Sequence, residues 1–101
     1  MITFSERAVI PSHVLIRFLD QESVLLNLET EKYFGLDAVG TRMWQLVTAA
    51  ATVEVALAQL VEEYDAPPET LRTDLTKLLQ HLLDNGLIEL QTTDVGKTSP
   101  V

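Results

Sequence analysis

The sequence has 101 residues, which is the size of a single small domain. Its apolar fraction of 47% is that of a globular protein, and the absence of cysteine excludes disulfides and thiolate metal sites. Fifteen acidic residues against seven basic ones give a net charge of −8, which argues against nucleic acid as a partner because phosphate binding depends on Lys and Arg.

The first twelve residues carry no clear periodicity, and Pro11 disfavours a central strand there. We therefore expect residues 1–12 to form an N-terminal extension to the domain. The sequence lacks the basic start and apolar core of a signal peptide, and it has no apolar run long enough to span a membrane. These observations lead us to expect a cytoplasmic protein with no membrane partner.

Alternating apolar residues predict three antiparallel strands. The first begins at His13 and is about six residues long by this alternation, and the other two cover Ser23–Leu28 and Lys32–Leu36. The loop between the last two strands is predicted to be Glu29–Glu31, with Glu31 at the position that commonly requires a positive φ angle. The third strand is expected to lie at an open edge of the sheet.

The register of the last two strands decides which aromatic residue faces the core. The predicted register pairs Leu26 with Phe34 and Val24 with Leu36, which places all four on the core face and Tyr33 on the opposite face. A register slipped by one residue would exchange Tyr33 and Phe34. The sequence leaves this alternative open.

Three helices are predicted after the strands. Asp37 and Thr52 suit the N-cap positions of the first two helices, which run to about Ala50 and over Val53–Tyr64. The third helix begins at Pro67-Pro68 and continues to Asn85, where Gly86 stops it. It carries an apolar stripe of Leu71, Leu75, Leu78, Leu79, Leu82 and Leu83.

This leucine stripe has two interpretations. Either all six residues fill the core, or some of them line a groove, and the pattern alone does not distinguish the two.

After the third helix, residues 87–90 are predicted to form a short extended segment. Residues 91–101 are small and polar, and we expect them to be a disordered tail. The domain itself is therefore expected over residues 13–90.

No pattern in the sequence indicates catalysis. The serines lie outside any nucleophile-elbow motif, and no glycine-rich loop precedes a helix. His81 and Asp84 are three residues apart on a predicted helix, but two ligands without a third make a weak metal site. We expect no catalytic residues, no metal and no cofactor.

The order of elements and several local features resemble the PqqD-like family. The matching segments are LLNLETEKYFGLDAVGTRMW, with Tyr33-Phe34, Gly35–Asp37, Gly40 and Trp44, and YDAPPETLRTDLTKLLQHLLDNGLI. Members of this family are recognition elements for the precursor peptides of ribosomally made, post-translationally modified peptides. The resemblance covers about residues 13–90, and Glu31 departs from the glycine common in the family's turn.

The resemblance implies an α+β, winged-helix-like fold with a three-stranded N-terminal sheet packed on a three-helix bundle. It also implies that the leader segment of a precursor peptide adds as a strand beside Lys32–Leu36, in a groove closed by the helix at 68–85. The expected peptide-binding residues are Lys32, Tyr33, Phe34, Gly35, Leu36, Leu71, Arg72, Asp74, Leu75, Lys77, Leu78 and Leu82.

The length of the chain resembles that of the discrete leader-binding proteins of lasso-peptide pathways, where the partner is a leader peptidase. The alternative within the family is a peptide chaperone that serves a radical-SAM enzyme, as in pyrroloquinoline-quinone synthesis.

Outside this family, the element types also fit a winged-helix transcription regulator or a homodimerisation domain. A regulator would have a basic recognition helix, whereas residues 68–85 carry three acidic and two basic residues. A monomer or weak dimer is expected.

Overall fold

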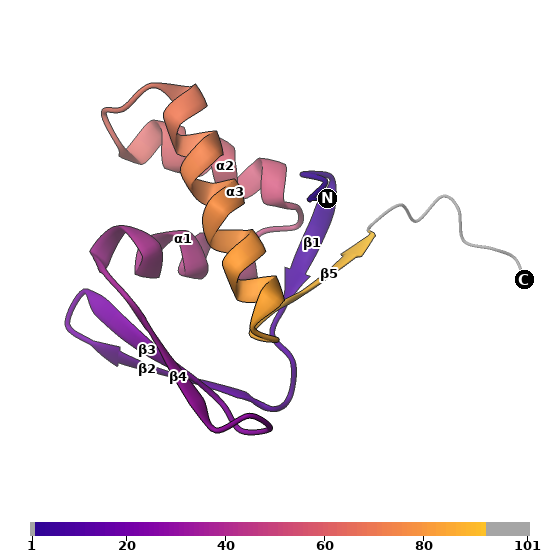
Figure 1. Cartoon of the computed structure of the whole chain (residues 1–101). Coiled ribbons are helices and arrows are strands. Elements are labelled where there is room, and N and C mark those ends of the chain that lie inside the picture. Colours follow the sequence, from indigo (N-terminus) through magenta and orange to yellow (C-terminus); the bar gives the residue numbers. More distant parts are fainter. Residues whose placement is uncertain (1, 93–101) are drawn as a thin grey trace, which may run out of the picture.

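The computed structural model describes residues 2–92 as an α+β fold in which three helices pack beside two small sheets (Figure 1). The antiparallel β2–β3–β4 sheet lies on one side of the helices, as predicted, and β1 pairs with β5 at another side. None of the helices in residues 2–92 has the length and apolar character needed to cross a membrane. The elements are β1 (Glu6–Val9), β2 (Val14–Leu19), β3 (Glu22–Asn27), β4 (Lys32–Leu36), α1 (Ala38–Ala49), α2 (Val53–Glu63), α3 (Pro68–Asp84) and β5 (Glu89–Thr92).

The two ends of the described chain form the β1–β5 sheet. β1 lies inside the segment 1–12 that the sequence analysis sets apart from the domain, and its Ala8 is buried in the core opposite Leu90. Ile2 and Phe4 also pack against the core. Gln91 and Thr92, which fall within the predicted tail, belong to β5, and residues 93–101 lie outside the described residues.

The helix boundaries follow the capping residues that the sequence analysis identifies. Asp37 accepts a hydrogen bond from the Gly40 amide at 2.8 Å, and Thr52 accepts one from the Val55 amide at 3.2 Å. Pro68 occupies the first turn of α3, where a missing amide hydrogen costs nothing. Gly86 ends α3 with φ +69°, a conformation that strains any side-chain-bearing residue.

The predicted register between β3 and β4 is wrong by one residue. Leu25 lies opposite Phe34 and Ser23 lies opposite Leu36, so Leu26 pairs with Tyr33. Because side chains alternate along a strand, the slip moves Leu25 into the core, with none of its surface exposed. On β4 itself the prediction is confirmed, since Leu36 is buried and Tyr33 is 73% exposed.

Hydrogen bonding explains why polar residues of β3 face inward. Ser23 and Asn27 are buried, but Ser23 shares a 2.7 Å hydrogen bond with Thr41 and Asn27 bonds the end of α3. The connecting loop has four residues, 28–31, where three were predicted, and this extra residue shifts the register. Glu31 has φ +61°, which confirms the predicted positive φ at that position.

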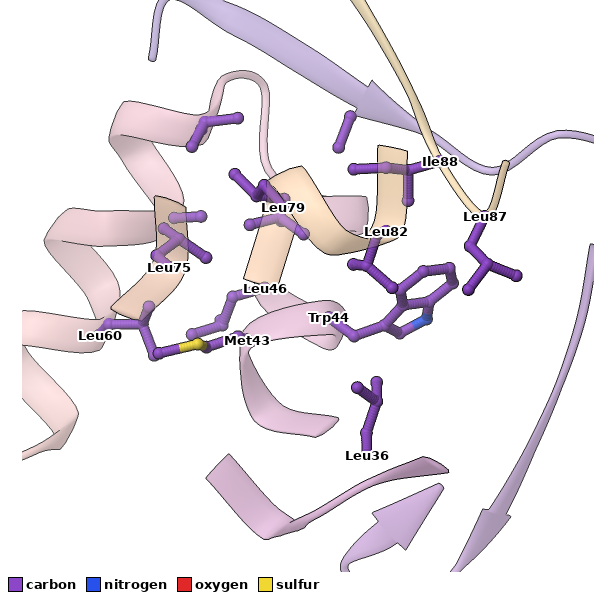
Figure 2. Close-up of a cluster of buried hydrophobic side chains, with 14 of the residues drawn as sticks. Leu36, Met43, Trp44, Leu46, Leu60, Leu75, Leu79, Leu82, Leu87 and Ile88 are labelled. Carbon is purple, nitrogen blue, oxygen red and sulfur yellow. The ribbon is translucent and has the colours of Figure 1, made fainter. Parts of the chain in front are cut away.

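The core lies between the helices and the inner face of the β2–β3–β4 sheet. Figure 2 shows the side chain of Trp44 from α1 among Leu36 of β4, Leu82 of α3 and Leu87, which follows α3. Trp44 is 2% exposed, as expected of a core anchor. Leu75 and Leu79 extend the same core toward α2 (Figure 2).

An ion pair joins α1 to α2 and predicts a pH-dependent stability. The Arg42 side chain hydrogen-bonds both oxygens of Glu63, at 2.8 and 2.6 Å, and this contact lowers the pKa of the Glu63 carboxyl. A carboxyl whose pKa is lower in the folded state adds stability above its unfolded pKa and loses it as the pH falls through the folded value. Glu63→Gln should therefore destabilise the protein at neutral pH, and the difference from wild type should vanish in acid.

Urea denaturation of wild type and Glu63→Gln at several pH values measures this effect. Glu62→Gln is the matched control because Glu62 is exposed and, within the described residues, makes no ion pair. A difference between wild type and Glu63→Gln that persists unchanged at low pH would contradict the assignment of the ion pair.

Candidate functional site

The β4 strand forms one edge of the main sheet. It pairs with β3 on one side only, and no strand within residues 2–92 pairs with its other edge. The backbone of an edge strand offers free N–H and C=O groups to another extended chain. Gly35, in the middle of β4, leaves open space where a side chain would stand. β4 is therefore able to accept an additional strand.

The α3 helix lies beside this edge. We refer to β4 and α3 as the two walls of the candidate site. The ring of Phe34 on β4 lies 4.5 Å from the ring of His81 on α3, with a tilt of 45° between them. Residues at i, i+4 and i+7 share one side of a helix, so Asp74 and Leu78 lie on the same side of α3 as His81. We call the set Phe34, Leu78 and His81, with the adjoining backbone of β4, the β4–α3 surface.

The structure separates the predicted peptide-binding leucines into two groups. Leu71, Leu75 and Leu82 are at most 4% exposed and belong to the core. Leu78 is half-buried and reaches the surface. The apolar stripe is thus mainly a core contact, and only its margin is available to a ligand.

Arg72 lies on a different side of α3 from the β4–α3 surface. Its guanidinium is 3.2 Å from a carboxylate oxygen of Glu54 on α2 and stacks over the Phe4 ring at 4.6 Å. These contacts turn Arg72 toward α2 and the N-terminal segment. The structure therefore does not bring it together with the other predicted site residues.

The charged residues near the β4–α3 surface include two lysines. Lys32 begins β4 and Lys77 lies on α3, and neither forms an ion pair within the described part of the chain. A polar cavity of about 390 Å³ lies at the start of β4. Its lining is His13, Asn27, Glu29, Thr30, Lys32, Asp84, Asn85 and Gly86.

His81 is the site residue that the sequence analysis did not assign to peptide binding. In the sequence its only partner is Asp84, as a weak metal pair, but Asp84 accepts a hydrogen bond from Gln80 at 2.9 Å. Residues 2–92 contain no group of three His, Asp or Glu side chains placed to hold a metal. The spacing of His81 from Leu78 and Asp74 is the signal that would have placed it beside them.

The outer face of the sheet is a separate apolar surface. Leu15, Leu26 and Tyr33 form a row across the three strands, and Leu15 and Tyr33 are largely exposed. A hollow of about 430 Å³ is lined by this row together with Ile16, Arg17 and Val24. Tyr33 therefore belongs to the face away from α3, and Phe34 is the aromatic residue that faces the helix.

An open strand edge beside a partly apolar helix side is the architecture of domains that bind extended peptides by strand addition. Comparison with known proteins also points to a family of peptide-binding domains. The family of coenzyme PQQ synthesis protein D (PqqD) matches residues 22–88, which include β3, β4 and all three helices. The chain belongs to the PqqD family.

Relatives and solved structures support the family assignment. A PqqA binding protein of Rhodopseudomonas palustris is 30% identical over 89 residues, covering 86% of this chain and 87% of the relative. The structure of TbiB1 in complex with the TbiA(beta) leader peptide is 37% identical, with a TM-score of 0.75, and covers 80% of this chain and 94% of that one. Lasso peptide synthetase B1 complexed with the leader peptide shares the fold at 18% identity and a TM-score of 0.74, over 82% and 98% of the two chains.

Proposed function

We propose that this chain binds the leader segment of a ribosomally made precursor peptide and delivers it to a processing enzyme, with no chemistry of its own. The leader adds as a strand along the free edge of β4. The observation that carries this proposal is the position of that edge beside the Phe34–His81 contact on α3. The 37% identity with TbiB1, a protein solved with a leader peptide, supports it.

The strand β4 and the helix α3 make different contributions to peptide recognition. The backbone of Lys32–Leu36 forms hydrogen bonds that fix the register of the leader and do not depend on its sequence. Alternate leader side chains then point toward α3, where Phe34 and Leu78 offer apolar contacts and His81 a polar ring. Affinity comes mainly from the first set of contacts and selectivity from the second.

Binding promotes processing by bringing substrate and enzyme together. A free leader is disordered and loses conformational entropy when it docks. Once it is held, the segment that follows the leader reaches an enzyme bound to the same complex at a high effective concentration. In this role the protein acts as a peptide chaperone in the cytoplasm and needs no cofactor.

For the processing enzyme, we propose the leader peptidase of a lasso-peptide pathway, on the resemblance to discrete leader-binding proteins. The second candidate is a radical-SAM peptide-modifying enzyme, as in pyrroloquinoline-quinone synthesis. Similarity to PqqA binding proteins supports that candidate. Co-purification of the chain with each type of enzyme encoded near its gene distinguishes the two.

Fluorescence polarisation of labelled leader peptides tests the proposal. The probes are the leaders of short precursor genes near this gene, with a scrambled sequence of the same composition as control. Saturable binding of one native leader, and none of its scrambled form, is the expected result. A folded sample that binds no neighbouring leader, and that sediments as a dimer, would replace the proposal with the homodimerisation alternative.

Lys77 and Arg72 provide a matched pair of charge variants. Lys77→Gln should change leader affinity by about two- to threefold at low salt, and the effect should fade at high salt, because exposed charges are screened. Arg72→Gln should leave the affinity unchanged, since Arg72 contacts Glu54 and Phe4 away from β4. Titrations at low and high salt measure both variants, and an equal effect of the two would contradict the placement of Arg72.

A further inference from the structure

A cluster of hydrogen bonds joins the β3–β4 hairpin to the end of α3. We call His13, Asn27, Asn85 and Gly86 the clasp. The Asn27 side-chain amide donates to the Asn85 carbonyl at 2.9 Å, and His13 Nε2 lies 3.0 Å from the Gly86 carbonyl oxygen. These bonds connect segments more than fifty residues apart in the sequence. The clasp therefore fixes the position of α3 relative to the hairpin.

Asn27 is the central residue of the clasp. It is 3% exposed, and its side-chain oxygen accepts hydrogen bonds from the amides of Glu29 and Thr30 at 2.9 and 3.2 Å. One side chain thus shapes the loop before β4 and holds the end of α3. A buried amide with all these partners is costly to replace, because the groups left behind lose their hydrogen bonds.

His13 reinforces the same connection from the start of β2. A carbonyl oxygen only accepts hydrogen bonds, so Nε2 must carry the proton that it donates to Gly86. The other ring nitrogen lies 3.6 Å from a carboxylate oxygen of Glu29, and the His13 carbonyl accepts from the Leu28 amide at 2.8 Å. His13 is therefore linked both to the hairpin loop and to the residue that ends α3.

Gly86 leaves the space that the clasp needs. A Cβ atom at this position would stand 3.0 Å from the Asn27 amide nitrogen, which is tighter than nine in ten real Cβ contacts. The same glycine also has the positive φ that ends α3. The end of the helix and its attachment to the hairpin thus depend on one backbone conformation.

The clasp is directly connected to the β4–α3 surface. Asn27 pairs with Lys32, the first residue of β4. At the other end, the Asn85 side chain donates to the His81 carbonyl at 2.8 Å, and the His81 ring contacts Phe34 on β4. These contacts connect β4 to α3 at two places, through the clasp at the start of β4 and through the ring contact of Phe34 with His81. Asn27 is thus joined to β4 by strand pairing and to the end of α3 by a hydrogen bond.

We propose that Asn27 and His13 are positioning residues for peptide binding, which set the separation of β4 and α3 without contacting the peptide. This inference rests on the proposed function. Asn27 is too buried to touch a ligand added at the edge, so its effect passes through Lys32, Asn85 and His81. Without the clasp, β4 and α3 are able to move apart. A peptide docked on β4 then loses part of its contact with α3.

Ser23 provides a matched control. It is as buried as Asn27 and lies on the same strand, but its hydroxyl bonds Thr41 on α1 at 2.7 Å, at the opposite end of β3. Ser23→Ala therefore removes a buried polar contact between the sheet and the helices without touching the clasp. A loss of stability alone affects both variants, whereas a change in wall separation affects only the clasp variant.

The experiment compares Asn27→Ala, Ser23→Ala and wild type by fluorescence polarisation with the labelled leader, under conditions where urea denaturation shows each protein to be folded. Asn27→Ala should weaken binding by about tenfold and Ser23→Ala by less than about twofold. In the free proteins, the NMR cross-peaks between the Phe34 and His81 rings should weaken in Asn27→Ala only. Equal affinity losses in the two variants, or unchanged ring cross-peaks in Asn27→Ala, would overturn the inference.

Two His13 variants give an independent test. His13→Gln keeps an N–H donor near the position of Nε2 and should bind the leader within about twofold of wild type, whereas His13→Phe should lose about as much as Asn27→Ala. Equal binding by both His13 variants would count against the clasp. Failure of the wild type to bind any leader removes the proposed function itself, whereas wild-type binding with no difference between Asn27→Ala and Ser23→Ala removes only this inference.

Discussion

Leu78→Arg should abolish leader binding and leave the chain folded. Leu78 is half-buried on the side of α3 that carries His81, so a long charged side chain there can reach water without entering the core. A docked peptide would cover that charge, and burying an unpaired charge is strongly unfavourable. We expect the affinity to fall by about 100-fold or more.

Gln80→Arg is the control for this variant. It introduces the same charge on the same helix, at an exposed position on the side of α3 away from Leu78, where the new guanidinium can pair with Asp84. Circular dichroism and urea denaturation establish that both proteins are folded, and fluorescence polarisation gives their affinities. Normal binding by folded Leu78→Arg would show that the leader docks somewhere other than the β4–α3 surface.

Leu75→Ala should have the opposite pattern, with a large loss of stability and little change in leader affinity. Leu75 has no exposed surface and lies in the core shown in Figure 2. Truncating a fully buried leucine to alanine removes apolar contacts and leaves a cavity, which lowers the free energy of unfolding by about 2–5 kcal/mol. That is a large part of the total stability of a small domain, typically about 5–15 kcal/mol.

Leu78→Ala completes the comparison. It removes the same atoms one turn along the helix, from a side chain that is already half in solvent. Urea denaturation should show a smaller loss of stability than in Leu75→Ala, and polarisation should show the larger loss of affinity. If Leu75→Ala, measured where it is folded, instead lost affinity as strongly as Leu78→Ala, the division of the α3 leucines into core and surface would be wrong.

Much of the fold was predictable because its signals are local. Asp37 and Thr52 cap their helices through bonds to amides three residues away, and Gly86 ends α3 through its own φ angle. Such interactions depend on neighbours in the sequence, so composition and spacing reveal them. The placement of β4 at a sheet edge and the inward position of Leu36 were also predicted, from the order of the strands and from the alternation of side chains along β4.

The register of β3 was not predictable because it depends on distant partners. Ser23 and Asn27 are polar and would normally face water, but Thr41 and Asn85 satisfy their hydrogen bonds inside the fold. Both partners are at least eighteen residues away in the sequence. Without them, the alternation of Val24 and Leu26 was the stronger signal, and it pointed to the wrong face.

The candidate site was predicted more fully on β4 than on α3. Every residue of β4 belongs to the edge strand, whatever its side chain, because an edge strand offers its backbone to another chain. On α3 the apolar stripe is wider than the part that reaches the surface, so Leu71, Leu75 and Leu82 were assigned to the ligand although they are core residues. The orientations of Arg72 and His81 were not predictable, because the rings that they contact, those of Phe4 and Phe34, are remote in sequence.

The pairing of β1 with β5 has a consequence for how this domain is joined to others. Glu6 lies opposite Thr92, so the start of β1 and the end of β5 lie side by side. A polypeptide fused before β1 and one fused after β5 would start from nearly the same point and need linkers of similar length to reach the same target. A target can therefore be tethered at either end of this domain from the same small sheet.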